Sequence, residues 1–195
     1  MHKDDKMEFL PIFKDGNEVY AGFWRRLGAA VVDILVLIPF ASLFHYLKSI
    51  NISMAIVAAV INLFVFSIYS IYFNIRYGGT LGKLAVGIRI TKPNGEKIGV
   101  REAFLRSSVD LAHALIFAIL QFQAISQVAS DAYLTAGYIE RIRLLVPFYP
   151  AYSKYVGFLS DIWYWSEMIV LLLNKRKRAL HDFIAGTVVI HKEYA

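Results

Sequence analysis

The sequence contains no cysteine among its 195 residues, and only 18% of them are charged. The absence of cysteine excludes disulfides, thiol nucleophiles and cysteine-ligated zinc or iron–sulfur sites. An ordinary soluble domain has about 25% charged residues. Here 57% of the residues are hydrophobic, which excludes intrinsic disorder and indicates a chain that uses lipid as part of its solvent.

Sequence motifs of enzyme chemistry are also lacking. Neither an HExxH nor a GxSxG pattern occurs, and the five histidines are scattered. The string GGTLGKL is similar to a phosphate-binding loop, but its glycine spacing is wrong and Leu84 follows Lys83 where that loop needs Ser or Thr. We therefore expect no enzymatic activity, no cofactor and no metal site. The glycines of this region are interpreted as a turn that lies close to a helix.

Two long apolar segments, Leu27–Leu47 and Met54–Phe73, are each long enough to cross a bilayer, and the first carries a single carboxylate, Asp33. Two further segments, Val109–Ala129 and Val156–Leu173, are less apolar, and their free energy of insertion into the bilayer is close to zero. We expect both to insert with their polar faces turned inward, the alternative being that the third lies partly in the interface. The sequence thus predicts an all-α integral membrane protein, a four-span helical bundle.

The distribution of basic residues predicts the orientation of these spans. If the chain crosses four times, 17 of its 21 lysines and arginines fall on one side of the membrane. By the positive-inside rule, both termini and the long middle connection are cytoplasmic, in a plasma or inner membrane. This also attributes the net charge of +6 to loops rather than to nucleic-acid binding. We divide the chain into a cytoplasmic segment (1–20), a membrane domain (21–190) and a tail (191–195).

The middle connection contains signals for β-structure. In GIRITKPNGEKIG, apolar residues alternate before Asn94 and Gly95, a dipeptide typical of hairpin turns. A third short strand is predicted over Thr187–His191, where it could pair with that hairpin. We therefore expect a small cytoplasmic β-hairpin or three-stranded element beside the spans.

Arginine and aspartate recur at helical spacing near the predicted cytoplasmic ends of the spans. In the first pair, Arg26 and Asp33 are seven residues apart and share one helix face. Asp33 is then either an ion-binding carboxylate or half of a buried ion pair that fixes packing. The other two pairs either converge with the first in one charged cluster or share this spacing by chance, and the sequence leaves both interpretations open. The three pairs are Arg26–Asp33, Arg106–Asp110 and Arg178–Asp182.

Titratable side chains occur at several depths of the predicted spans. Glu167 is the deepest carboxylate, and His113, one turn after Asp110, could exchange protons with it near neutral pH. A proton or cation path requires such a series, which here consists of Asp33, Asp110, Glu167 and His113, although each could equally be a packing contact. The basic run Lys175–Arg178 should attract anionic headgroups, or serve only as a topology signal.

Three separated motifs resemble the RDD family of small integral membrane proteins. They are YAGFWRRLGAAVVDILVL, GGTLGKLAVGIRITKPNGEKIGVREAFLR and KRALHDFIAGTVVI, and they span roughly Tyr20 to Ile190 in the order typical of the family. The family is named for one arginine and two aspartates, which the resemblance assigns to Arg26, Asp33 and Asp182. Its pattern is usually described with two or three spans, so the polar third span departs from it.

The resemblance implies a choice between two functions. Some family members are reported to behave as cation/proton antiporters, and others are associated with membrane quality control. We therefore expect exchange of a monovalent cation for protons at Asp33, with a non-transporting scaffold or assembly factor as the alternative. The expected partners are the lipid bilayer, the cation and proton, and a second copy or another membrane protein, with no nucleic acid.

Overall fold

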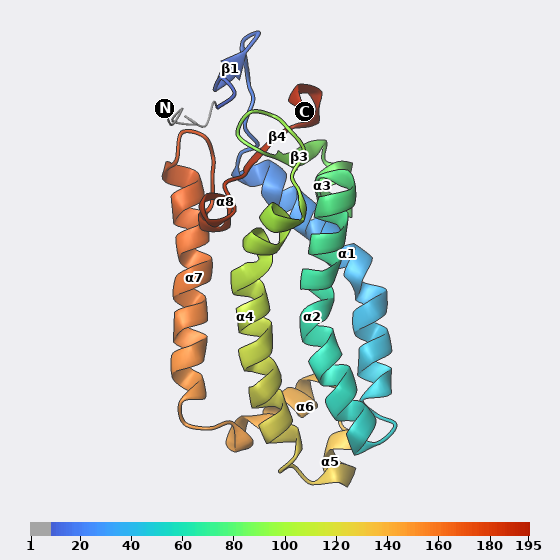
Figure 1. Cartoon of the computed structure of the whole chain (residues 1–195). Coiled ribbons are helices and arrows are strands. Elements are labelled where there is room, and N and C mark those ends of the chain that lie inside the picture. The colour runs from blue at the N-terminus through green and yellow to red at the C-terminus, as the bar shows by residue number, and fades with distance from the viewer. Residues whose placement is uncertain (1–8) are drawn as a thin grey trace. The chain divides into compact units, whose positions relative to one another are not determined.

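Four long apolar helices dominate the computed structural model, which describes residues 9–195 (Figure 1). They contain 21 to 26 residues each, enough at about 1.5 Å per residue to cross a hydrocarbon core of about 30 Å. All four are long and apolar enough to span a membrane. These helices are α1 (Phe23–Leu47), α2 (Ile52–Tyr77), α4 (Val100–Ile125) and α7 (Ser153–Leu173).

Short elements connect the long helices and follow the last of them. The four strands form two antiparallel pairs, β1 with β2 and β3 with β4. The predicted fold class, mostly helical with a small β-element, is therefore confirmed. The short elements are β1 (Phe13–Lys14), β2 (Asn17–Glu18), α3 (Leu81–Ala85), β3 (Ile88–Thr91), α5 (Ser130–Thr135), α6 (Tyr138–Leu145), η1 (Val146–Phe148), α8 (Leu180–Ile184), β4 (Val188–His191) and η2 (Lys192–Tyr194).

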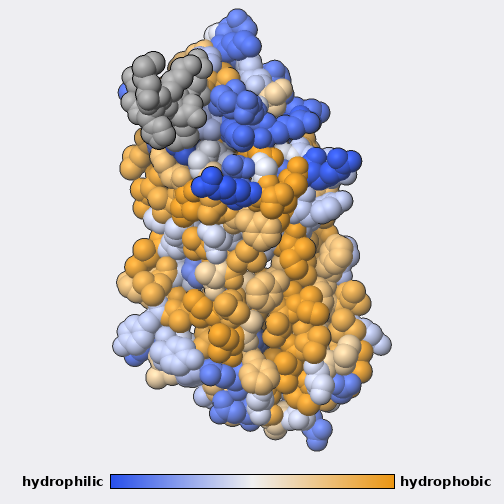
Figure 2. All heavy atoms as spheres, viewed as in Figure 1, coloured by the Kyte–Doolittle hydropathy of each residue, from blue (hydrophilic) through white to orange (hydrophobic). Residues whose placement is uncertain are grey.

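Large apolar side chains are exposed along all four long helices. Ile34, Ile68, Ile119 and Leu173 are examples, one from each helix, and Leu173 is 81% exposed. Figure 2 shows apolar side chains gathered over this part of the chain, between polar ends. Exposure on this scale would be costly in water but is expected in lipid. The chain is therefore a multi-pass membrane protein.

The helix bounds agree with the predicted spans except at the third. Helix α4 begins at Val100 rather than at Val109, and ends at Ile125 rather than beyond it. At its start the Glu102 carboxylate accepts the Gly99 N–H at 2.7 Å and so satisfies one of the free amides of the first turn. Arg106 thus belongs to the helix and not to the connection before it.

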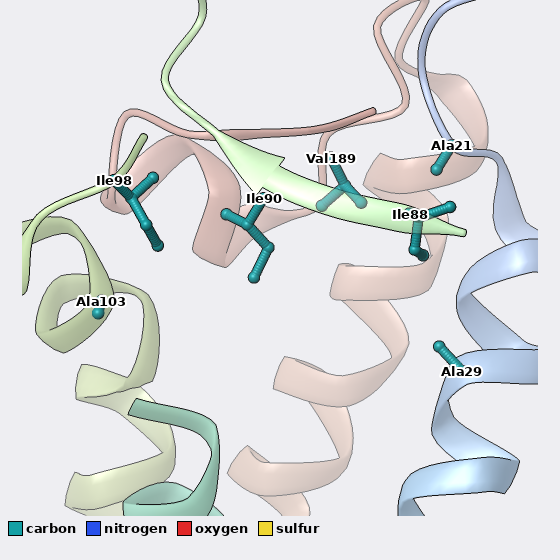
Figure 3. Close-up of a cluster of buried hydrophobic side chains, with 7 residues drawn as sticks. All are labelled: Ala21, Ala29, Ile88, Ile90, Ile98, Ala103 and Val189. Atoms are coloured by element: carbon teal, nitrogen blue, oxygen red, sulfur yellow. The ribbon is translucent and has the colours of Figure 1, made fainter. Parts of the chain in front are cut away.

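The described chain divides into two compact units. The first comprises residues 9–35, 69–108 and 163–195, and the second comprises residues 36–68 and 109–162. The β3–β4 sheet lies in the first unit, where Ile90 pairs directly with Val189. Small residues of α1 and α4 complete its core: Figure 3 shows Ala21, Ala29, Ile88, Ile90, Ile98, Ala103 and Val189 converging around the sheet.

The sheet confirms the predicted strand pairing. Gly95 adopts a positive φ of 88° in the predicted turn, and Thr91 forms a bridge with Lys97 across it. The predicted tail strand is β4, which pairs with β3. Tyr20 adds a further bridge to Ile190. The N-terminal segment and the tail are thereby joined to the middle connection by backbone hydrogen bonds.

A second hairpin, β1–β2, is absent from the sequence prediction. Its turn is Asp15–Gly16, and both residues have positive φ, 52° and 81°. Asp-Gly is a favoured pair for this turn, so the signal was present, but the strands of two residues each carry no apolar alternation. Of the predicted segment 1–20, residues 1–8 lie outside the described residues.

In the second unit, Arg141 holds the connection between α4 and α7. Its buried guanidinium donates to the carbonyl oxygens of Tyr133, Leu134 and His45 at 2.9–3.0 Å. These contacts satisfy a charge that would otherwise be costly to bury. They fix α5 and α6 against the end of α1.

Candidate functional site

Asp182 lies at the centre of an ion-pair network in the first unit. It is the third residue of α8 and is fully buried. Its Oδ2 lies 2.8 Å from Nη1 of Arg26 on α1, and its Oδ1 pairs with Nη1 of Arg106 on α4. The same Arg106 nitrogen donates to the hydroxyl oxygen of Thr187 at 2.8 Å. We call Arg26, Arg106 and Asp182 the arginine cluster.

The arginine cluster corrects the predicted pairing. Arg26 pairs with Asp182 and not with Asp33. Arg178 does not pair with the Asp182 carboxylate either, since its Nη2 and Nε donate to the carbonyl oxygens of Asp182 and Thr187, at 2.9 and 3.0 Å. Spacing along one helix identifies neighbours on a shared face, whereas these arginines reach partners brought near by the fold.

The electrostatics of the arginine cluster keep Asp182 ionised. Burial raises the pKa of a carboxyl group, but the guanidiniums of Arg106 and Arg26 outweigh it and hold the pKa of Asp182 well below its ordinary value. The Ala179 N–H, donated to Oδ2 at 2.9 Å, acts in the same direction. Asp182 is therefore a fixed charge and is not suited to carry protons.

Asp33 has a different environment from Asp182. This α1 residue is 3% exposed, and all its hydrogen-bond donors are neutral: the hydroxyls of Tyr69 and Thr80, at 2.7 and 2.6 Å, and the Gly82 N–H, at 2.7 Å. Within the described residues no basic side chain forms an ion pair with it. The groups in direct contact with its carboxylate are thus neutral dipoles.

Gly82 permits this contact between α3 and α1. A Cβ atom at Gly82 would overlap the Ala29 carbonyl oxygen and lie 2.8 Å from Oδ1 of Asp33. Only glycine lets the first turn of α3 present its amide to the carboxylate. The sequence interpretation of the glycine-rich string as a turn close to a helix is thus confirmed at this position.

Lys83 is the cation nearest in sequence to this contact. Its half-buried side chain places Nζ 3.4 Å from the Thr80 hydroxyl, which in turn donates to Asp33. Burial, followed by repulsion from Arg106, lowers the pKa of Lys83 to about 8, against an opposing effect of Asp33. Near neutral pH this ammonium is therefore closer to losing its proton than an ordinary lysine.

Glu167 and His181 form a second carboxylate contact. Glu167 Oε1 accepts the His181 N–H at 2.8 Å, and its Oε2 lies 2.7 Å from Nδ1 of the ring. Nε2 faces a nitrogen of Arg106 at 2.6 Å and must accept there, so the neutral ring carries its proton on Nδ1. Burial and Arg106 lower the pKa of His181.

The first unit brings together only part of the predicted site. Arg26, Arg106 and Asp182 meet directly, and Asp33 and Glu167 belong to the same unit. Asp110 and His113 lie on α4 in the second unit. Sequence reasoning missed several contacting residues, for which neither the spacing nor the hydropathy gave a signal: Tyr69, Thr80, His181 and Thr187.

Comparison with known proteins assigns most of the chain to one family. Residues 20–186 match the model of the RDD family. The chain is 29% identical over 176 residues to YckC of Bacillus subtilis (strain 168), described as an uncharacterized protein, with 88% of this chain and 84% of the relative covered. No solved structure matches. These similarities cover the arginine cluster and Asp33 but indicate no substrate.

Proposed function

The chain belongs to the RDD family of multi-pass membrane proteins, and from this premise we propose that it exchanges a monovalent cation for protons at Asp33. The proposal gives a role to a charged group inside a span, where carboxylates are costly. It places both termini in the cytoplasm, as the distribution of lysine and arginine predicts. Four helices enclose little space, so we expect a second copy or another membrane protein to complete the pathway.

The neutral surroundings of Asp33 carry the proposal. An arginine partner would occupy the carboxylate with a fixed counter-charge, whereas Asp33 has no ion-paired side chain among the described residues that a bound cation would have to displace. The Tyr69 and Thr80 hydroxyl oxygens lie at 2.7 and 2.6 Å from the carboxylate. Oxygen is the ligand that hard cations prefer, so the same groups could share in coordinating one. Competition between proton and cation for one carboxylate is the chemistry of antiport.

The other predicted residues take different roles under this proposal. Asp182 is held ionised by two arginines and does not exchange. Arg26 has no direct role at Asp33, because its guanidinium is bound to Asp182. The Glu167–His181 contact is a further candidate for a proton relay beside the predicted Asp110 and His113, since it joins a span carboxylate to a ring that is 30% exposed.

The proposal is tested with purified protein in liposomes that carry a pH gradient. Addition of sodium, lithium or potassium should dissipate the gradient with the wild type and not with Asp33→Asn. Asp161→Asn is the matched control, because it makes the same change at an exposed position of a long helix. The absence of a cation-dependent signal from folded wild type would contradict antiport, as would full activity of Asp33→Asn.

The arginine cluster favours a second candidate, a scaffold without transport. It joins α1, α4 and α8 through one buried carboxylate, which is an arrangement suited to holding segments together. If the protein is a scaffold, Asp33→Asn should lower thermal stability, because the contacts with the Gly82 N–H and the Tyr69 and Thr80 hydroxyls weaken. The wild-type scaffold should show no cation flux. Antiport predicts a folded, inserted and inactive variant.

A further inference from the structure

Figure 1 shows the loop between α7 and α8. Residues of this loop line a basic pocket that the proposed exchange does not use. The pocket has a volume of about 370 Å³ and opens where a membrane helix ends. Among the described residues its lining has three cationic side chains and no carboxylate. The lining residues are Leu173, Asn174, Lys175, Arg176, Arg178 and Phe183.

Two arginines of the pocket are held in place before any ligand arrives. Arg178 is buried and donates to two carbonyl oxygens, and its guanidinium stacks 4.0 Å from the Phe183 ring centre. The Arg176 guanidinium stacks 4.1 Å from the Phe9 ring centre. A guanidinium fixed in this way loses little further freedom on binding an anion.

One hydrogen-bond donor of an arginine that lines the pocket has no acceptor among the described residues. Nε of Arg176 is buried, yet within the part of the chain that the structure describes it meets no hydrogen-bond acceptor. Arg178 contacts the carbonyl oxygen of Asp182, while the carboxylate of Asp182 pairs with Arg26 and Arg106 instead. An anion with several oxygens could accept hydrogen bonds from Arg176, and arginine matches phosphate geometry well.

The apolar edge of the pocket indicates the form of the ligand. Leu173, its first lining residue, is 81% exposed and is preceded by the exposed Leu172 and Ile169 on the last turns of α7. An acyl chain could lie along this surface while its headgroup sits among the arginines. A free phosphate would have no use for the apolar edge.

We propose that this pocket binds the phosphate of an anionic phospholipid at the membrane interface. The shared chemistry is a phosphate group among three basic side chains, and the apolar wall favours the lipid over the free anion. The proposal is independent of antiport, because it uses none of the residues around Asp33.

Native mass spectrometry of the full-length protein in non-ionic detergent tests this site. Short-chain phosphatidylglycerol, phosphatidylcholine and inorganic phosphate are titrated in turn. Lys175→Gln/Arg176→Gln should weaken phosphatidylglycerol binding by about 5-fold per charge, or about 25-fold in all, with little effect on phosphatidylcholine. Lys97→Gln/Arg101→Gln is the matched control, because it removes two exposed charges from the same unit and should leave binding unchanged.

Each remaining outcome decides the proposal. If the double variant does not fold, Lys175→Glu at its exposed position is used alone, and a loss of binding supports the site. Equal losses in the double variant and the control would overturn it, since general surface charge would then explain the affinity. Binding of inorganic phosphate as tight as that of phosphatidylglycerol would assign the pocket to a free anion and overturn the lipid assignment.

Discussion

Arg26 and Asp182 are 156 residues apart in the chain, and their side chains form a 2.8 Å ion pair. Arg106 forms a second ion pair with Asp182, at the other oxygen of the same carboxylate. The buried Asp182 carboxylate therefore faces one buried cation, Arg106, and one partly buried cation, Arg26. The guanidinium of Arg178 donates in addition to the backbone carbonyl oxygen of Asp182. This arrangement makes Asp182 the position in the first unit where loss of one charge should matter most.

We expect Asp182→Asn to destabilise the protein by about 3–5 kcal/mol, because two arginines lose their buried counter-charge. Thermal unfolding of the detergent-solubilised protein measures the effect. Asp161→Asn, at an exposed position, should change the midpoint little. Equal midpoints for wild type and Asp182→Asn would show that the arginine cluster does not contribute to stability.

The pKa of His181 predicts a pH dependence of stability. Burial and Arg106 lower this pKa below 6.5, so the unfolded chain binds a proton before the folded one does. Stability should therefore be complete at pH 7 and above, and fall as the pH drops below about 6.5. Thermal unfolding between pH 5 and pH 8 tests this, and His181→Gln should flatten the profile over that range.

The control for that profile is His191→Gln, which removes a histidine on β4 while leaving its backbone pairing intact. This variant should retain the wild-type pH dependence. If both substitutions flatten the profile, or neither does, the burial of His181 beside Arg106 is not the source of the effect.

The close approach of α3 to α1 predicts that Gly82→Ala is poorly tolerated. Its methyl group would overlap the Ala29 carbonyl and press on Asp33, at a cost of about 1–3 kcal/mol or a displaced α3. Gly22→Ala meets no atom within 4 Å and should behave as wild type. Thermal unfolding and cation flux, measured on both variants, separate a loss of stability from a loss of the Asp33 contact.

The absence of cysteine permits a direct test of orientation. Asn94→Cys, in the β-turn of the middle connection, and Asp131→Cys, on α5, are both exposed. In intact cells an impermeant maleimide should label the residue at 131 and spare the one at 94, because the basic middle connection is predicted to be cytoplasmic. The reverse pattern would invert the topology.

Hydropathy and alternation predicted the elements, because both signals are local. The four spans follow from runs of apolar residues, and the hairpin turn follows from the dipeptide Asn94–Gly95. Helix α4 begins nine residues before the predicted third span, because a helix can carry an arginine such as Arg106 that reaches a buried partner. Elements whose structure is determined by one local segment can thus be predicted from the sequence.

The candidate site was less predictable, because its contacts join distant segments. Asp33 and Asp182 were identified as important, but their partners were not. Helical spacing paired Asp33 with Arg26, whereas the fold delivers a tyrosine, a threonine and a backbone amide to it. One sequence cannot distinguish these alternatives, since both satisfy the same carboxylate.

The long separation of Arg26 from Asp182 also has a consequence for the order of synthesis. A chain emerging from the ribosome exposes α1 to the membrane long before α8 has been made. Arg26 and Arg106 are then without their common counter-ion until α8, which carries Asp182, has been synthesised. A product truncated before Asp182 would retain all four long helices and still lack the anion that joins α1 to α4 through Arg26 and Arg106.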